Sequence, residues 1–153
     1  MQFCISQAPN LKDEVYAKYL KDSEFKVIKG ENHQLLSVSD SLILASGTVA
    51  LEATLYQTPM LIAYRGPWFF YLVYLLVRCI KRVSLPNIIA DKEIVNELIQ
   101  AKLSVKNIVD ETQKLLYETD YRDSHILELG KIKSMLSDKI SAQEVAKVIV
   151  KSL

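Results

Sequence analysis

The sequence predicts an α/β fold in which a parallel sheet is covered by helices on both faces. Short apolar segments alternate with segments whose apolar residues recur every third or fourth position. The intervals between these segments fit βαβ units, whose strands run parallel. Ser41–Ala45 has too few polar positions for a half-exposed strand, as expected of a strand buried on both faces. We expect the 153 residues to form one domain with a helical tail over residues 101–153.

The first part of the chain shows the alternation of strands and helices. Gln2–Ala8 is β-prone, and Pro9 stops it. A helical stripe follows, with apolar residues spaced by four. We expect a helix at Leu11–Leu20, a strand at Phe25–Ile28, a short helix from its cap Asn32 to Leu36, a strand at Ser41–Ala45, a helix at Val49–Tyr56 and a strand at Pro59–Tyr64.

From Asp91 onward the pattern is helical throughout. Asp91 and Ser141 are predicted N-caps, and Glu144 completes a capping box with Ser141. Gly130 is the weak point of the third of these helices. We expect helices at Asp91–Gln100, Val105–Tyr117, Tyr121–Leu136 and Ala142–Leu153.

Composition excludes several classes of protein. Half of the residues are hydrophobic and 24% are charged, so the chain should fold, and a net charge of +1 gives no general attraction to nucleic acid. Cys4 and Cys79 are far apart in sequence, as in reduced cytosolic proteins. The chain does not open with the basic segment of a signal peptide. The longest apolar run, Trp68–Val77, has ten residues, whereas a membrane-spanning helix needs about 20.

The turn after the third strand is the first candidate site. A buried strand ending at Ala45 runs into Ser46, Gly47 and Thr48, and a helix starts at once. Ligands of open α/β sheets lie beyond the carboxyl ends of the strands, and a helix N-terminus favours a phosphate. Glu52 follows one helical turn later, where its carboxylate can accept hydrogen bonds from two ribose hydroxyls.

A purely structural interpretation of this turn stays open. Ser46 or Thr48 can cap the helix, and Glu52 can be a solvated surface residue. The turn is neither a Walker A loop nor a GxGxxG loop, because the required lysine and glycines are missing.

The segment Val83–Ala90 is the second candidate. Pro86 fixes its backbone, and Asn87 can both donate and accept hydrogen bonds, as recognition of a base or sugar requires. The alternative is a simple turn before the helix predicted to begin at Asp91.

An aromatic and basic segment lies between these two. No Asp or Glu occurs from Ala53 to Ala90. As a helix, the apolar run that begins with Trp68 and Phe69 would be apolar almost all round, which suits a membrane interface or an acylated anionic ligand. The alternative is a buried core helix whose basic end complements its dipole. The basic residues of the segment are Arg65, Arg78, Lys81 and Arg82, the last three at the end of the predicted helix.

These segments, in this order, resemble the C-terminal part of the lipid-A-disaccharide synthase family. The resemblance runs from about Ser39 to Gln100, and the strands before and helices after it fit in type. The family pattern Ala-Ser-Gly-Thr-x-x-Leu-Glu, Pro-Met, Tyr-Arg, an aromatic helix, Ser-Leu-Pro-Asn and a helix ending Glu-Leu-[Ile/Leu]-Gln appears at Ala45–Glu52, Pro59-Met60, Tyr64-Arg65, Phe69–Val77, Ser84–Asn87 and Glu97–Gln100.

The resemblance implies one half of a GT-B glycosyltransferase, in which two Rossmann-like domains enclose the active site. The family joins a UDP-activated diacylglucosamine to diacylglucosamine 1-phosphate and releases UDP at the cytoplasmic surface of the inner membrane. It implies no metal or other cofactor, and His33 and His125 stand without a second ligand at metal spacing. The implied partners are the UDP-sugar donor, the acylated sugar phosphate acceptor, the N-terminal half of the enzyme and the membrane surface, with a homodimer allowed and no nucleic acid.

By resemblance, the donor site has four parts. The diphosphate faces Ser46, Gly47 and Thr48, and the ribose faces Glu52. Asn87 lies by the nucleotide sugar, and Arg65 neutralises charge near the leaving diphosphate. From the apolar and basic composition of the segment between the two candidates, we expect contact with lipid through Trp68, Phe69, Arg78, Lys81 and Arg82.

The chain also departs from the family. The acceptor domain with its acidic general base and the Gly-Ser-Arg loop are missing, so no catalytic residue is assigned. We expect an excised domain, a split gene product or a truncated frame that is inactive alone. Two alternatives remain: another GT-B enzyme of the peptidoglycan or UDP-GlcNAc epimerase type, and a non-catalytic domain that pairs with a separately encoded partner.

Overall fold

The chain forms two compact units, Met1–Ser39 and Asp40–Leu153. The computed structural model describes residues 1–21, 23–45, 47–67, 82–137, 146 and 149–151. We describe each unit by itself, and the single domain expected from the sequence stays a prediction.

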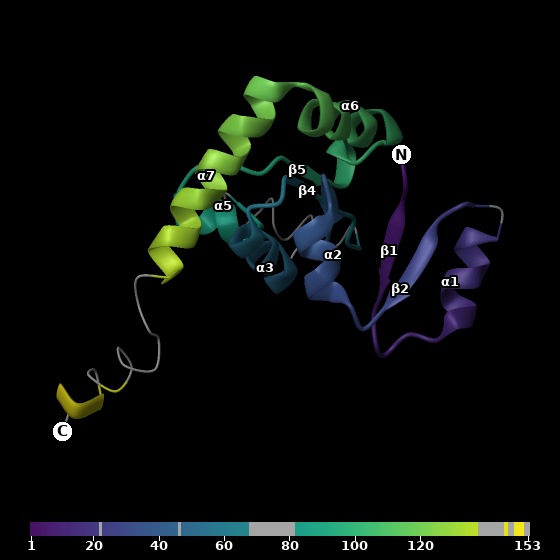
Figure 1. Ribbon diagram of the computed structural model, residues 1–153, viewed down its shortest axis with the longest axis horizontal. Coiled ribbons are helices and arrows are strands. Elements are labelled where there is room, and N and C mark those ends of the chain that lie inside the picture. The colour runs from purple at the N-terminus through teal and green to yellow at the C-terminus, as the bar shows by residue number, and fades with distance from the viewer. Residues whose placement is uncertain (22, 46, 68–81, 138–145, 147–148, 152–153) are drawn as a thin grey trace. The chain divides into compact units, whose positions relative to one another are not determined.

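The N-terminal unit is a βαβ unit followed by one short helix (Figure 1). Its two strands pair in parallel, in a register that runs from Cys4 opposite Lys26 to Gln7 opposite Lys29. Glu31 occupies the N-cap position of the short helix without a capping side-chain hydrogen bond, and Asn32, the predicted cap, is the first helical residue. The elements are β1 (Cys4–Gln7), α1 (Asp13–Leu20), β2 (Lys26–Lys29) and α2 (Asn32–Val38).

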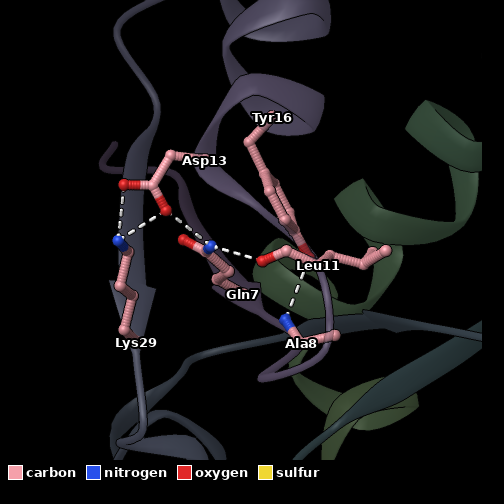
Figure 2. Close-up of polar contacts among 6 residues, drawn as sticks. All are labelled: Gln7, Ala8, Leu11, Asp13, Tyr16 and Lys29. Atoms are coloured by element: carbon pink, nitrogen blue, oxygen red, sulfur yellow. Dashed lines mark hydrogen bonds and ion pairs between the residues drawn. The ribbon is translucent and has the colours of Figure 1, made fainter.

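Polar contacts join the first turn of α1 to the carboxyl ends of both strands (Figure 2). The Asp13 carboxylate accepts hydrogen bonds from Gln7 Nε2 at 2.9 Å and from Lys29 Nζ at 2.6 and 2.7 Å. The Ala8 N–H donates to the Tyr16 hydroxyl at 2.9 Å. The bond from Gln7, followed by the bond and charge of Lys29, lowers the pKa of Asp13. These contacts fix the crossover helix beside its strands.

The C-terminal unit contains a three-stranded parallel sheet in the order β3-β4-β5. This result confirms the predicted parallel sheet. The elements of the C-terminal unit are β3 (Leu42–Leu44), α3 (Thr48–Tyr56), β4 (Met60–Tyr64), α5 (Leu85–Ala90), β5 (Glu97–Ile99), the 3₁₀ helix η1 (Gln100–Lys102), α6 (Val105–Tyr117) and α7 (Thr119–Ser137).

The central strand β4 is covered on both faces. Met60, Leu61 and Ile62 are all 0% exposed, and successive strand residues point to opposite faces. Leu61 packs in a buried cluster with Leu98 of β5 and Leu115 of α6. Helix α3 also contacts β4. The prediction of a sheet flanked by helices is therefore confirmed.

The prediction of a helix at Asp91–Gln100 is wrong. The helix here is α5, with Pro86 in its first turn, where proline costs no hydrogen bond. Asp91 ends this helix in the left-handed region, at φ 50°. Glu97–Ile99 forms strand β5 instead, because pairing with the buried β4 overrides the helix propensity of these residues.

The later helices follow the prediction more closely. Helix α6 has the predicted bounds, and α7 extends the predicted Tyr121–Leu136 at both ends. It continues through Gly130, where an added Cβ would lie 2.8 Å from Nε2 of Gln57 at the end of α3. This glycine therefore allows α3 and α7 to approach closely. The helix predicted at Ala142–Leu153 lies largely outside the described residues.

Candidate functional site

The three strands of the C-terminal unit end at one edge of their sheet, because all of them run parallel. Gly47 follows β3, Arg65 follows β4 and Gln100 follows β5. Gln100 Nε2 donates to the carbonyl of Gly66 at 3.0 Å, and Arg65 Nη2 donates to the carbonyl of Leu103 at 3.2 Å. These bonds tie the loop after β4 to the segment after β5. Ligands of parallel α/β sheets bind at such an edge.

The junction between β3 and α3 presents an open helix N-terminus. Gly47 is the N-cap, with φ 139°, a conformation that L side chains rarely adopt, and it has no side chain to cap the helix. Thr48 is the first helical residue, so it is not the N-cap, and its side chain is exposed. The predicted partner Ser46 lies outside the described residues. The first N–H groups of α3 have no partner within the helix and point toward the carboxyl edge.

Glu52 lies one helical turn after Thr48 on the same face of α3. Its side chain is half-buried. Within the described parts of the chain, its carboxylate makes no hydrogen bond or ion pair. A half-buried carboxylate without a protein partner is suited to accept hydrogen bonds from a ligand.

Arg65 is exposed at the same edge. Its guanidinium uses one donor on Leu103, and a guanidinium has five. Arg65 therefore keeps donors for an anion that binds beyond the end of β4.

Asn87 is fully buried and has a structural role. Its Nδ2 donates to the Val95 carbonyl and to Glu97 Oε1, both at 2.8 Å. Its Oδ1 accepts from the N–H groups of Ile94 at 2.8 Å and Val95 at 2.9 Å. These four bonds use the whole capacity of the amide. The Asn87 side chain therefore has no free group for the predicted contact with the donor. We leave this residue out of the proposed site.

Glu97 explains why the Ser84–Asn87 segment is fixed, and sequence reasoning missed it. Its carboxylate accepts from the Val83 N–H at 3.0 Å, from the Ser84 N–H at 2.8 Å and from Ser84 Oγ at 2.7 Å, besides Asn87. The available signal is the acidic first residue of Glu-Leu-Ile-Gln, a stretch that the sequence pattern predicts as helix. The carboxylate anchors the start of α5 to β5.

The residues predicted to contact lipid are only partly described. Trp68, Phe69, Arg78 and Lys81 lie outside the described residues. Arg82 is described, and its Nη1 pairs with the Asp91 carboxylate at 2.6 Å while its Nη2 donates to the Asp91 carbonyl. Arg82 thus stabilises the C-terminal end of α5.

His125 is buried in α7. Its Nε2 accepts a hydrogen bond from the Met60 N–H at 3.3 Å, so the proton of the neutral ring lies on Nδ1. Burial lowers the pKa of His125 to about 4, although the charge of Glu111 acts in the opposite direction. Among the described residues no cluster of His, Cys, Asp or Glu could hold a metal ion.

A hollow of about 270 Å³ lies between β5 and α6, away from the predicted residues. Its wall contains Glu111, which is 3% exposed and accepts from Asn96 Nδ2 at 2.9 Å and from the Tyr121 hydroxyl at 2.5 Å. Burial and the bond to Glu111 raise the pKa of Tyr121. Because the buried acid of this wall, Glu111, is already paired within the protein, we favour the carboxyl edge as the ligand site.

The fold and the site define a Rossmann-like α/β domain with a candidate anion site at the carboxyl edge of its sheet. None of its described helices is both long and apolar enough to cross a membrane. The family model for lipid-A-disaccharide synthetase matches residues 2–150. The chain belongs to the lipid-A-disaccharide synthase family.

Curated relatives agree with this assignment. The chain is 36% identical to the lipid-A-disaccharide synthase of Psychromonas ingrahamii over 137 residues, covering 89% of this chain and 36% of the relative. It is 35% identical to the synthase of Coxiella burnetii over 150 residues, covering 97% and 39%. For Anaeromyxobacter dehalogenans the identity is 30% over 152 residues, covering 97% and 40%. The chain thus spans 36% to 40% of the length of these relatives.

Proposed function

We propose that this chain holds the UDP part of UDP-2,3-diacylglucosamine in a lipid-A-disaccharide synthase. The enzyme transfers the acylated sugar to 2,3-diacylglucosamine 1-phosphate and releases UDP. Membership of the family supports the reaction class. The observation that supports the binding role is the β3–α3 junction. There, a helix N-terminus without a side-chain cap and Glu52, which has no partner among the described residues, lie on one helix.

Each part of the junction fits one part of UDP. The free N–H groups at the start of α3 and the Thr48 hydroxyl bind the diphosphate, because a helix N-terminus favours negative charge. Gly47 lets the backbone come close to the ligand. Glu52 accepts hydrogen bonds from both ribose hydroxyls, and Ser46 adds a hydroxyl beside Gly47.

The proposed role in catalysis is to stabilise the leaving group. Negative charge grows on UDP as the glycosidic bond breaks, and the start of α3 together with Arg65 offsets that charge. A general base must also take the proton from the acceptor hydroxyl. We assign that base to the N-terminal half of the enzyme, so turnover requires both halves.

We further propose peripheral contact with the cytoplasmic surface of the inner membrane. Trp68 and Phe69 supply apolar surface, and Arg78 and Lys81 supply positive charge. Arg82 contributes less than the sequence predicted, because it pairs with Asp91.

Glu52→Gln tests the ribose contact. The substitution keeps the size of the side chain and removes its charge. Hydrogen bonds to a charged group contribute roughly 1.5–3 kcal/mol. In the active enzyme, the donor KM should therefore rise by about ten-fold to a hundred-fold, at 1.4 kcal/mol per decade. Gln still accepts one bond, so we expect the lower end of this range.

Asp123→Asn is the matched control, because Asp123 is an exposed carboxylate on α7. This control should leave both KM and the thermal midpoint unchanged. Unchanged KM in Glu52→Gln together with a lowered midpoint would show that Glu52 is a structural residue, and the ribose contact would be withdrawn.

A further inference from the structure

Gln100 lies beside the loop that follows β4. Tyr64 of β4 is opposite Ile99 of β5 in the parallel register, and Arg65 and Gln100 are the next residues along the two segments. At Gln100 the chain leaves the strand and enters η1. The Gln100 side chain is half-buried, and its Nε2 donates to the Gly66 carbonyl at 3.0 Å. This bond joins two segments at the carboxyl edge that are far apart in sequence.

The backbone of Gln100 adopts a conformation that the preceding strand does not require. Among the described residues, Gln57 and Asp91 also have a positive φ, and both stand where a helix ends, as is common. Gln100, with φ 51°, instead follows a strand and opens a 3₁₀ helix. A left-handed backbone is unfavourable for a residue with a side chain, and such residues cluster at functional sites. Contacts of the turn must therefore offset this cost.

The same turn brings a second acceptor to the loop. The Leu103 N–H donates to the Gln100 carbonyl at 3.1 Å, and the Leu103 carbonyl accepts from Arg65 Nη2 at 3.2 Å. The loop also lies close to β4, since a Cβ added to Gly66 would be 3.2 Å from Cε1 of Tyr64. One bond thus holds the backbone of the loop, and the other holds the guanidinium of Arg65.

We propose that Gln100 is a positioning residue, which fixes the loop after β4 so that Arg65 meets the diphosphate of the donor. This role rests on the function proposed above. Within the described parts of the chain, Arg65 pairs with no carboxylate, so its charge stays available to a ligand. A preoriented guanidinium stabilises the charge that grows on the leaving group, whereas a mobile one must first be ordered. Loss of the Gln100 bond should therefore slow the chemical step more than it weakens donor binding.

Nitrogen relaxation of the Gly66 amide tests the bond in the full chain without substrate. Gln100→Met keeps the length and unbranched shape of the side chain but removes the donor. The Gly66 order parameter should fall from about 0.85, the value of rigid backbone, to below about 0.6. Gln57→Met is the matched control, because Gln57 is also left-handed, with φ 57°, and lies at the end of α3. This control should leave the Gly66 order parameter unchanged.

A double-substitution cycle in the active enzyme tests the positioning role. Gln100→Met should lower kcat by about ten-fold, the effect of one hydrogen bond, with a smaller change in the donor KM. Gln100→Asn should do the same, because Asn is favoured in the left-handed region but its amide is one carbon shorter and does not reach the Gly66 carbonyl. In an Arg65→Met background, Gln100→Met should cause no further loss, because it acts through Arg65.

Different results overturn the two proposals. If Gly66 keeps its order in Gln100→Met, or if the kcat losses of Gln100→Met and Arg65→Met multiply, Gln100 does not act through Arg65 and the positioning role is wrong. If Arg65→Met alone leaves kcat unchanged, the charge neutralisation proposed for Arg65 is wrong, and the positioning role falls with it. An equal fall in kcat for Gln57→Met would assign the effect of Gln100→Met to a general loss of stability.

Discussion

Two glutamates of the C-terminal unit differ in what their carboxylates bind. Glu97 accepts hydrogen bonds from Val83, Ser84 and Asn87, so the fold uses its charge fully. Glu52 has no such partner among the described residues and is half-buried on the helix that begins at the carboxyl edge. A carboxylate gains most from a ligand when the protein leaves it unpaired. Because of this contrast, we propose Glu52 as a contact of the donor.

His125 should make stability depend on pH. Its pKa is about 4 in the folded protein against 6.5 for the free side chain, so the unfolded chain binds the extra proton between these values. The stabilisation is complete above pH 6.5 and is lost as pH falls toward 4. This contribution of His125 to the free energy of unfolding is about 3 kcal/mol, at 1.36 kcal/mol per pKa unit. Urea unfolding at several pH values measures it.

His125→Gln is the control for this pH dependence. Gln can accept the Met60 N–H bond but does not titrate. The variant should show a smaller loss of unfolding free energy over the same range. An equal loss in both proteins would assign the pH dependence to other groups.

At the scale of elements, apolar periodicity predicted the structure well where elements are long or buried. It placed α6 with its observed bounds and placed β3 and β4 within a residue or two. It failed between Leu85 and Ile99, where a short helix with proline in its first turn meets a left-handed Asp91. Strand β5 is three residues long and forms through pairing with β4, which local propensity does not encode.

The local geometry of the candidate site could also be predicted from the sequence. A glycine between a buried strand and a helix indicated the open N-terminus that the structure shows at Gly47. For Asn87 the sequence left two roles open, because a polar residue after proline is equally suited to bind a ligand or its own loop. Only the tertiary contacts to Val95 and Glu97 distinguish the two.

The segment proposed to contact the membrane allows a matched test. Each basic residue near an anionic surface contributes about 1 kcal/mol. Replacing Arg78 and Lys81 by Gln should thus weaken binding to vesicles rich in phosphatidylglycerol by roughly thirty-fold, at 1.4 kcal/mol per decade. Cosedimentation at low and high salt measures this, and salt should reduce the difference.

Arg82→Gln provides the comparison, because Arg82 already pairs with Asp91. Replacing Arg82 should lower the thermal midpoint, because it removes this ion pair. It should weaken vesicle binding less than the Arg78 and Lys81 replacements do. If vesicle binding survives the Arg78 and Lys81 replacements, the segment does not contact lipid through these charges.

At the scale of the whole molecule, we propose that the chain forms the donor-binding part of a larger enzyme. It spans 36% to 40% of the length of the relatives described above. The proposed UDP contacts lie in the Asp40–Leu153 unit. If the proposal holds, nucleotide binding should be measurable on this chain, and turnover is expected only when the proposed acceptor-binding half is added.

Amide hydrogen exchange with and without UDP tests the central claim most directly. If the start of α3 cradles the diphosphate, the Thr48, Val49 and Ala50 amides should exchange more slowly when UDP is present. The first amides of α6, where Ser104 already caps the helix, should not change. Protection at α6 or elsewhere, with none at Thr48 to Ala50, would contradict the assignment of the donor site to the β3–α3 junction.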